Sequence, residues 1–161
     1  MNRYMFMAGG SLAGLALIAT IAMWIARPGT AVAHCQVPCG IYDDKARIAR
    51  LHEDTVTIEK AITNINELAG KHDAQSLNQA TRWITTKEAH ASHIIEVVSE
   101  YFLTQKIKPV SPGADGYDAY LTKLADHHAV MVAAMKTKQN VGTVFADQLH
   151  HAIDALAKHY E

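Results

Sequence analysis

The chain has 161 residues, and its formal net charge is −1 with the ten histidines counted as neutral. This length is enough for one domain with a modest core, and no basic stripe or run suggests binding to nucleic acid. The chain has two cysteines, and in an exported protein two cysteines ordinarily form one disulfide.

The first 33 residues have the layout of an export signal. Arg3 precedes an uncharged apolar run over residues 4–26, and the segment ends in the small-residue triplet Ala-Val-Ala at 31–33. We expect cleavage after Ala33, because the preceding Pro-Gly pair breaks the helix and leaves the triplet extended. The apolar run has about the 20 residues that a bilayer crossing needs, so an uncleaved membrane anchor is the alternative.

Removal of residues 1–33 would leave residues 34–161 as the mature domain, with His34 at its amino terminus. This domain holds 13 Lys and Arg against 16 Asp and Glu, a formal charge of −3. We expect a leader-processing protease and a periplasmic or extracellular location. The alternatives are a membrane-tethered protein and a cytoplasmic protein whose leader is processed.

Residues 34–42, HCQVPCGIY, contain both cysteines and are called the hook segment here. Once cleaved, His34 offers an imidazole and an α-amine with a pKa near 8. Cys35 offers a thiolate and a backbone amide, and Cys39 offers a second thiolate. Amine, amidate and two thiolates form a planar set with the imidazole in reach of an axial position, which suits nickel or copper. A closed tetrahedral site would suit zinc.

Four amphipathic helices are predicted after the hook segment. The first begins at Asp43 or Asp44 and ends at Gly70, and the second runs from about Asp73 to about Lys106. The third begins near 115–118, and the fourth follows Asn140-Val141-Gly142. The expected inward residues are Ile48, Leu51, Thr55, Ile58, Ile62, Ile65 and Ala69; Leu77, Ala80, Ile84, Ala91, Ile94, Val98 and Tyr101; Leu121, Leu124, His128, Met131 and Met135; and Phe145, Leu149, Ile153, Leu156 and Tyr160.

Helices of this length with short links predict an all-α fold, an antiparallel (up-down) four-helix bundle with an irregular amino-terminal metal hook. The Glu-x-x-His pattern of ferritin-like di-iron bundles is missing, and so is a Cys-x-x-Cys-His haem attachment. We interpret the nine histidines beyond the hook segment as structural or surface residues, although His90 and His93 share a helix face.

The pattern His34-Cys35-x-x-Pro38-Cys39-Gly40-x-Tyr42 resembles the nickel hook of the nickel-containing superoxide dismutases. The resemblance continues through the helical body and includes Glu100-Tyr101-Phe102, where the family commonly has Asp-Tyr-Phe. It implies a four-helix bundle assembled as a homohexamer, with the leader removed and one nickel ion per subunit. The implied reaction converts superoxide to dioxygen and hydrogen peroxide while nickel alternates between +2 and +3.

The resemblance also implies roles for individual residues. His34 would be the amine and axial imidazole ligand, Cys35 the thiolate and amidate ligand, and Cys39 the second thiolate. Tyr42 would stand over the open face and order water or the incoming anion, the alternative being a partly buried anchor. Tyr101 is a second candidate for that region.

Two departures from the family pattern concern the residues around the hook imidazole. Where members have an orienting glutamate this chain has Ala49 followed by Arg50, and where they have an arginine it reads Thr85-Thr86-Lys87. Because a domain of charge −3 repels an anion, steering would need local lysines such as Lys45 or Lys87.

Two other classes of function stay open at this point. One is an exported His/Cys bundle that carries nickel or copper without turnover. The other is a structural bundle held to the membrane by residues 4–26, with Cys35 and Cys39 joined in a disulfide.

Overall fold

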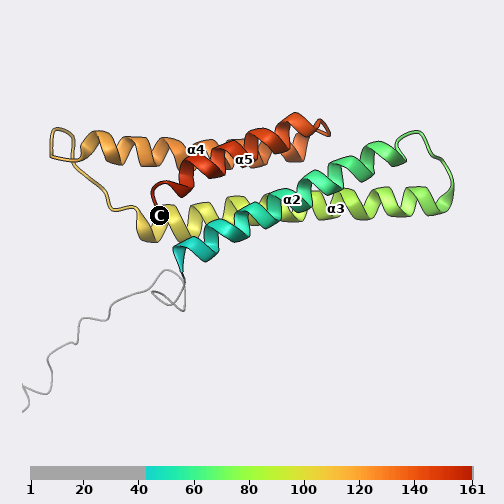
Figure 1. Ribbon diagram of the computed structural model, residues 1–161, viewed down its shortest axis with the longest axis horizontal. Coiled ribbons are helices and arrows are strands. Elements are labelled where there is room, and N and C mark those ends of the chain that lie inside the picture. Colours follow the sequence, from blue (N-terminus) through green and yellow to red (C-terminus); the bar gives the residue numbers. More distant parts are fainter. Residues whose placement is uncertain (1–42, 161) are drawn as a thin grey trace, which may run out of the picture. The chain divides into compact units, whose positions relative to one another are not determined.

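The computed structural model describes residues 43–160. The described chain is helical throughout and contains no strand, as expected. Its elements are α2 (Asp44–Leu68), α3 (Ala74–Glu96), the π-helix η1 (Val97–Lys106), α4 (Tyr117–Gln139) and α5 (Thr143–Ala157) (Figure 1). Because η1 continues α3 without a break, these elements form the four predicted helices, and the predicted boundaries are confirmed to within a few residues.

Local capping explains where the first two helices begin and end. The Asp43 carboxylate accepts a hydrogen bond from the Lys45 amide at 2.8 Å, which makes Asp43 the N-cap of α2. Asp73 caps α3 in the same way through the amide of Ser76. Gly70, with φ of 81°, reverses the chain after α2 in a conformation that glycine adopts without steric cost.

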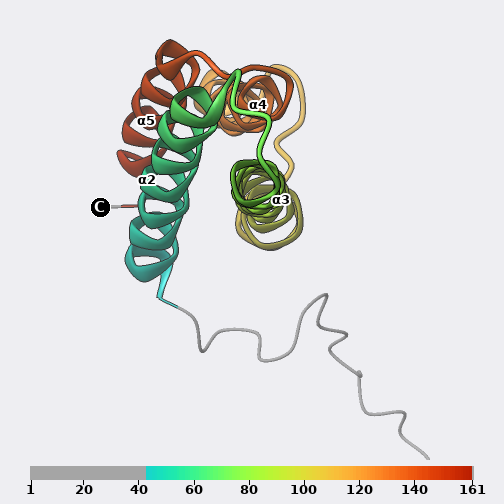
Figure 2. The ribbon, with the colours of Figure 1, turned by 90° about the vertical axis from the view of Figure 1, so that its right-hand side faces the viewer.

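The four helices pack as a bundle in which each helix has two main neighbours. α2 contacts α3 and α5, while α4 contacts α3 and α5 (Figures 1 and 2). The core is built from the apolar stripes of all four helices. Its fully buried large side chains include Leu51, Ile58, Ile62, Ile94, Val98, Phe102, Val130, Leu149, Ile153 and Leu156.

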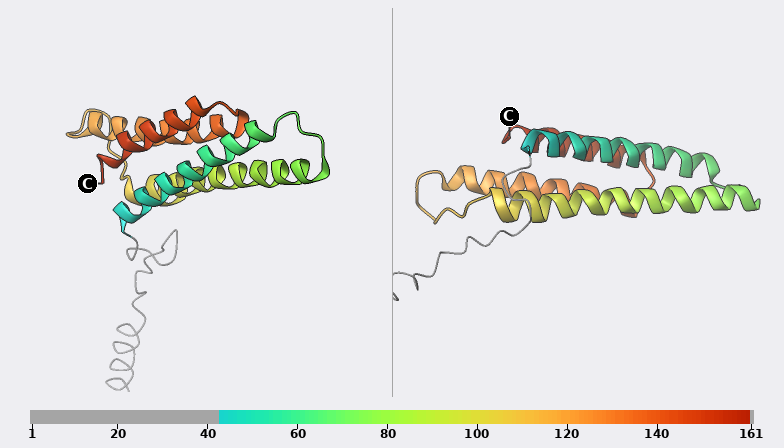
Figure 3. Two further views of the ribbon diagram at one scale, coloured as in Figure 1. Left: turned by 45° about the vertical axis from the view of Figure 1, so that its right-hand side comes forward. Right: turned by 90° about the horizontal axis from the view of Figure 1, so that it is seen from below.

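The predicted inward stripe of α3 is wrong in its amino-terminal half. Leu77 and Ile84 are 52% and 45% exposed, and the first buried residue of α3 is Lys87. Figures 1 and 3 show the reason, since this half of α3 and the end of α2 extend beyond α4 and α5. A stripe there has no second layer of helices to cover it.

The predicted register of α4 is also wrong. Leu121, His128 and Met135 are exposed, whereas the neighbouring His127 is fully buried. The buried stripe of α4 consists of His127, Val130, Ala133, Ala134 and Thr137. Its small and polar members carry little hydrophobic signal, so the larger apolar side chains one position further along, such as the partly buried Met131, dominated the pattern.

None of the helices in the described part of the chain combines the length and the apolar character that a membrane crossing requires.

Candidate metal centre

The predicted ligands His34, Cys35 and Cys39 lie outside the described residues, and so does Tyr42. The structure describes the chain from Asp43, one residue after the hook segment, at the N-cap of α2. It therefore shows the groups at the start of α2 and on the elements that pack against it.

Tyr101 of η1 meets the first turn of α2. Its side chain is 4% exposed, and its hydroxyl donates a hydrogen bond to Asp44 Oδ1 at 2.5 Å. Lys106, one turn further along η1, lies 2.8 Å from Asp44 Oδ2. One carboxylate thus holds a phenol and an ammonium group from the same π-helix.

Cationic groups flank the ring of Tyr101. The guanidinium carbon of Arg47 lies 4.8 Å from the ring centroid and the Lys106 ammonium 5.7 Å, both within cation–π range. Burial raises the pKa of Tyr101, and the hydrogen bond to Asp44 raises it further, so the phenol keeps its proton at neutral pH. Tyr101 therefore has a neutral hydroxyl bonded to Asp44 and a ring flanked by two cations.

The π-helix places Tyr101 and Phe102 in the core together. The Thr104 hydroxyl bonds back five residues to the Ser99 carbonyl, and the Ile107 amide bonds to the Phe102 carbonyl. This wider turn buries residues in pairs, 97 with 98 and 101 with 102. The sequence pattern of residues 73–106 predicts one regular amphipathic helix and gives no signal of a π-helix.

Behind Tyr101 lies an aromatic cluster. Phe102 packs against Tyr101 and Tyr160, with ring centroids 5.1 and 4.6 Å away. The buried His127 has Nε2 2.7 Å from the Tyr160 hydroxyl and Nδ1 2.6 Å from the Lys123 carbonyl. Because a carbonyl only accepts, Nδ1 donates to it, and Nε2 of the neutral ring accepts from Tyr160. The cluster supports the Tyr101 position from the core side.

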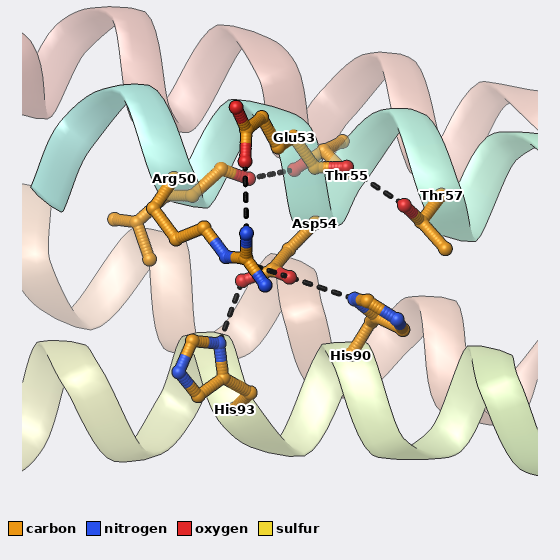
Figure 4. A network of polar contacts seen from close by, with 8 residues as sticks. Arg50, Glu53, Asp54, Thr55, Thr57, His90 and His93 are labelled. Carbon is orange, nitrogen blue, oxygen red and sulfur yellow. Dashed lines mark hydrogen bonds and ion pairs between the residues drawn. The ribbon is translucent and has the colours of Figure 1, made fainter. Parts of the chain in front are cut away.

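His90 and His93 face the same carboxylate across the α2 and α3 contact (Figure 4). Asp54 is 1% exposed, and each of its oxygens lies 2.7 Å from the Nδ1 atom of one imidazole. Arg50 Nε lies 3.9 Å from Asp54 Oδ1. The arrangement satisfies a buried carboxylate completely, which is a structural role.

Other histidines also make cross-helix contacts. His52 and His150 face each other through their Nδ1 atoms at 3.4 Å, and His159 Nε2 lies 2.7 Å from an Asp126 oxygen. Within residues 43–160 no three His, Cys, Asp or Glu side chains are grouped so as to hold a metal ion. The hook segment remains the predicted ligand set.

The structure describes the residues at both departures from the family pattern. Ala49 is exposed, and Arg50 pairs with Glu53 at 3.0 Å. The predicted steering role of Lys87 is wrong, because this side chain is 3% exposed and its ammonium lies 2.6 Å from the carbonyls of both Thr137 and Lys138. It holds the carboxyl end of α4. Lys45 is exposed, and its steering role stays a prediction.

The donor chemistry of the hook segment fits nickel. Thiolates, an amine, a deprotonated amide and an imidazole are nitrogen and sulfur donors of the kind that favour a tetragonal nickel or copper ion. Calcium and magnesium would need oxygen ligands, which are few here.

The described fold is an all-helical bundle, and its described side chains supply a protonated phenol and cations beside the start of the first helix. The family model of nickel-containing superoxide dismutase matches residues 29–161. The chain therefore belongs to the nickel-containing superoxide dismutases, which are oxidoreductases that act on superoxide. No curated protein and no solved structure matches this chain.

Proposed function

We propose that this protein disproportionates superoxide at one nickel ion per subunit, held by His34, Cys35 and Cys39. The observation that carries the proposal is the match of the family model to residues 29–161, which includes the hook segment and the whole helical body. Two superoxide ions and two protons would give one dioxygen and one hydrogen peroxide.

Bound nickel would supply a one-electron couple between +2 and +3. The donors of this chain make that couple accessible, because electron-rich thiolate and amidate ligands stabilise the higher oxidation state. The thiolates must be free for this role, so a disulfide between Cys35 and Cys39 would abolish the site. His34 would contribute its imidazole and, after cleavage, its amine.

Tyr42, which lies outside the described residues, and the described Tyr101 would act on the anion and on access to it. Tyr42 would order water or superoxide over the open face. Tyr101 would support that position, because its hydroxyl is fixed by Asp44 and its ring lies beside Arg47 and Lys106. These cations offer a local attraction for an anion in a domain of net negative charge.

The assembly and processing of the chain complete the proposal. We infer an up-down, antiparallel helix order from the short connections 69–73 and 140–142. The family resemblance supports a homohexamer, and the exposed Leu77 and Ile84 on the uncovered half of α3 would suit contacts between subunits. Removal of residues 1–33 by a protease, and a periplasmic or extracellular location, follow from the leader-like sequence.

Measurement of superoxide decay separates an enzyme from a metal carrier. Processed protein loaded with nickel should consume many superoxide ions per nickel, with hydrogen peroxide formed at half that number. A stoichiometric reaction that stops after about one superoxide per metal would show a carrier, and the proposed function would be wrong.

A further inference from the structure

A cavity of about 260 Å³ lies between the end of η1, the following connection and the first turns of α4. It is lined by Lys106, Ile107, Lys108, Val110, Gly116, Ala119, Tyr120 and Lys123. The lining holds three lysines and no acidic residue. This concentration of positive charge contrasts with the slightly negative charge of the whole chain.

Two of the three lysines of the cavity have no carboxylate partner among the described residues. Lys106 pairs with Asp44 at 2.8 Å, but neither Lys108 nor Lys123 forms an ion pair with any carboxylate of the described residues. Lys108 Nζ donates only to the Gln105 carbonyl, at 3.0 Å. Lysine side chains that line one cavity bring positive charges near one another, and a bound anion would offset their mutual repulsion.

The remaining lining residues are apolar or aromatic, and the cavity is small. Tyr120 brings an aromatic ring and a hydroxyl, while Ile107 and Val110 bring apolar surface. A volume of about 260 Å³ lies just below the range of roughly 300–1,000 Å³ that is usual for drug-sized ligands. The space therefore suits a small ion better than a nucleotide.

We propose that this cavity binds a small, multiply charged oxyanion of the phosphate or dicarboxylate type. Lys108 and Lys123, which form no ion pair with a described carboxylate, would supply charge-assisted hydrogen bonds to its oxygens, and Lys106 would add positive charge beside its pair with Asp44. None of the predicted nickel ligands belongs to the lining of the cavity, whose residues lie between 106 and 123. It connects to the region of Tyr101 through one group, since the Lys106 ammonium already binds Asp44, which accepts from Tyr101.

Titration of the processed full protein with inorganic phosphate tests the site, with calorimetry and amide NMR as readouts. We expect saturable binding that shifts the amide signals of Gly116, Ala119 and Tyr120. Lys123→Gln should weaken binding about tenfold, because loss of one charge-assisted hydrogen bond costs about 1.5 kcal/mol or more. A parallel titration with malonate compares the dicarboxylate class, and the tighter of the two anions identifies the class that the cavity prefers.

Lys136→Gln is the matched control, because it removes the same charge from an exposed position near the other end of α4. Its affinity should stay within about twofold of the unmodified protein, since only long-range screened charge is lost. Equal weakening by both substitutions would show a general charge effect and overturn the proposal. Absence of saturable binding of either anion at millimolar concentrations would overturn it too.

Discussion

The hydroxyl of Tyr101 lies 2.5 Å from a carboxylate oxygen of Asp44, a residue 57 positions earlier in the chain. This bond joins η1 to the first turn of α2, two residues after Tyr42. It fixes the orientation of the one sequence-predicted site residue that the structure describes. Tyr101 is thereby a buried, oriented group and not a mobile surface phenol.

Tyr101→Phe tests this bond. The ring contacts with Phe102 would persist while the hydroxyl is lost, so the free energy of unfolding should fall by about 1.5–3 kcal/mol, the usual value for a bond to a charged group. Superoxide turnover should fall several-fold at unchanged nickel content. Urea unfolding and superoxide decay are the measurements.

Tyr117→Phe is the control for Tyr101→Phe, because the Tyr117 hydroxyl has no hydrogen-bond partner among the described residues. Tyr117→Phe should leave the free energy of unfolding and the superoxide turnover nearly unchanged. Equal effects of the two substitutions would contradict a specific role of the bond between Tyr101 and Asp44.

Mild acid should destabilise the bundle through His127 and His52. Burial lowers the pKa of each below the ordinary 6.5, so the unfolded chain takes up these protons before the folded protein does. The free energy of unfolding is therefore highest above pH 6.5 and falls as pH drops toward the folded pKa values, with a slope of up to about 1.4 kcal/mol per pH unit for each proton.

Urea unfolding between pH 7.5 and 5.5 measures this slope. His127→Leu lowers stability at every pH because it leaves Tyr160 without its acceptor, but the slope should become shallower. An unchanged slope in this variant would show that His127 is not the source of the acid sensitivity.

Lys87→Met tests the buried ammonium at the end of α4. The substitution leaves the carbonyls of Thr137 and Lys138 without their donor, which should cost about 2–3 kcal/mol of stability. The matched change Lys45→Met on the exposed face of α2 should stay within about 0.5 kcal/mol. Similar losses from the two changes, measured by urea unfolding, would contradict the structural assignment.

Substitution of either hook cysteine should separate metal chemistry from folding. Cys35→Ser or Cys39→Ser removes a thiolate, so nickel-dependent superoxide decay should disappear. Circular dichroism should show unchanged helical content, because the described core uses neither residue. Residual nickel-dependent turnover in either variant would rule out the proposed ligand set.

The helices were predictable because their stripes and caps are local features. Leu51, Ile58 and Ile62 recur at helical spacing and all face the core, since α2 has neighbours along most of its length. The exposure of Leu77 and Ile84 was not predictable, because it depends on where α4 and α5 end in space. A periodic stripe shows which residues share a face, but not whether another helix covers that face.

The site shows the same division between local and tertiary information. The hook segment was recognised because its donors are adjacent in sequence, and Tyr101 because it lies in a family-like triplet. Its partner Asp44 was missed, since the bond depends on how η1 crosses α2 and on a π-helical turn. Lys87 was misread because its burial comes from α4, a helix 50 residues away in sequence.

The central claim is that the amine of His34 joins two thiolates in holding nickel. The most direct measurement compares nickel content and free thiols of the chain beginning at His34 with those of the same chain carrying one extra residue before it. The account predicts about one firmly bound nickel in the first chain and a large loss in the second, although both keep Cys35 and Cys39. Equal nickel binding by the two chains, or a disulfide with no nickel in the first, would contradict it.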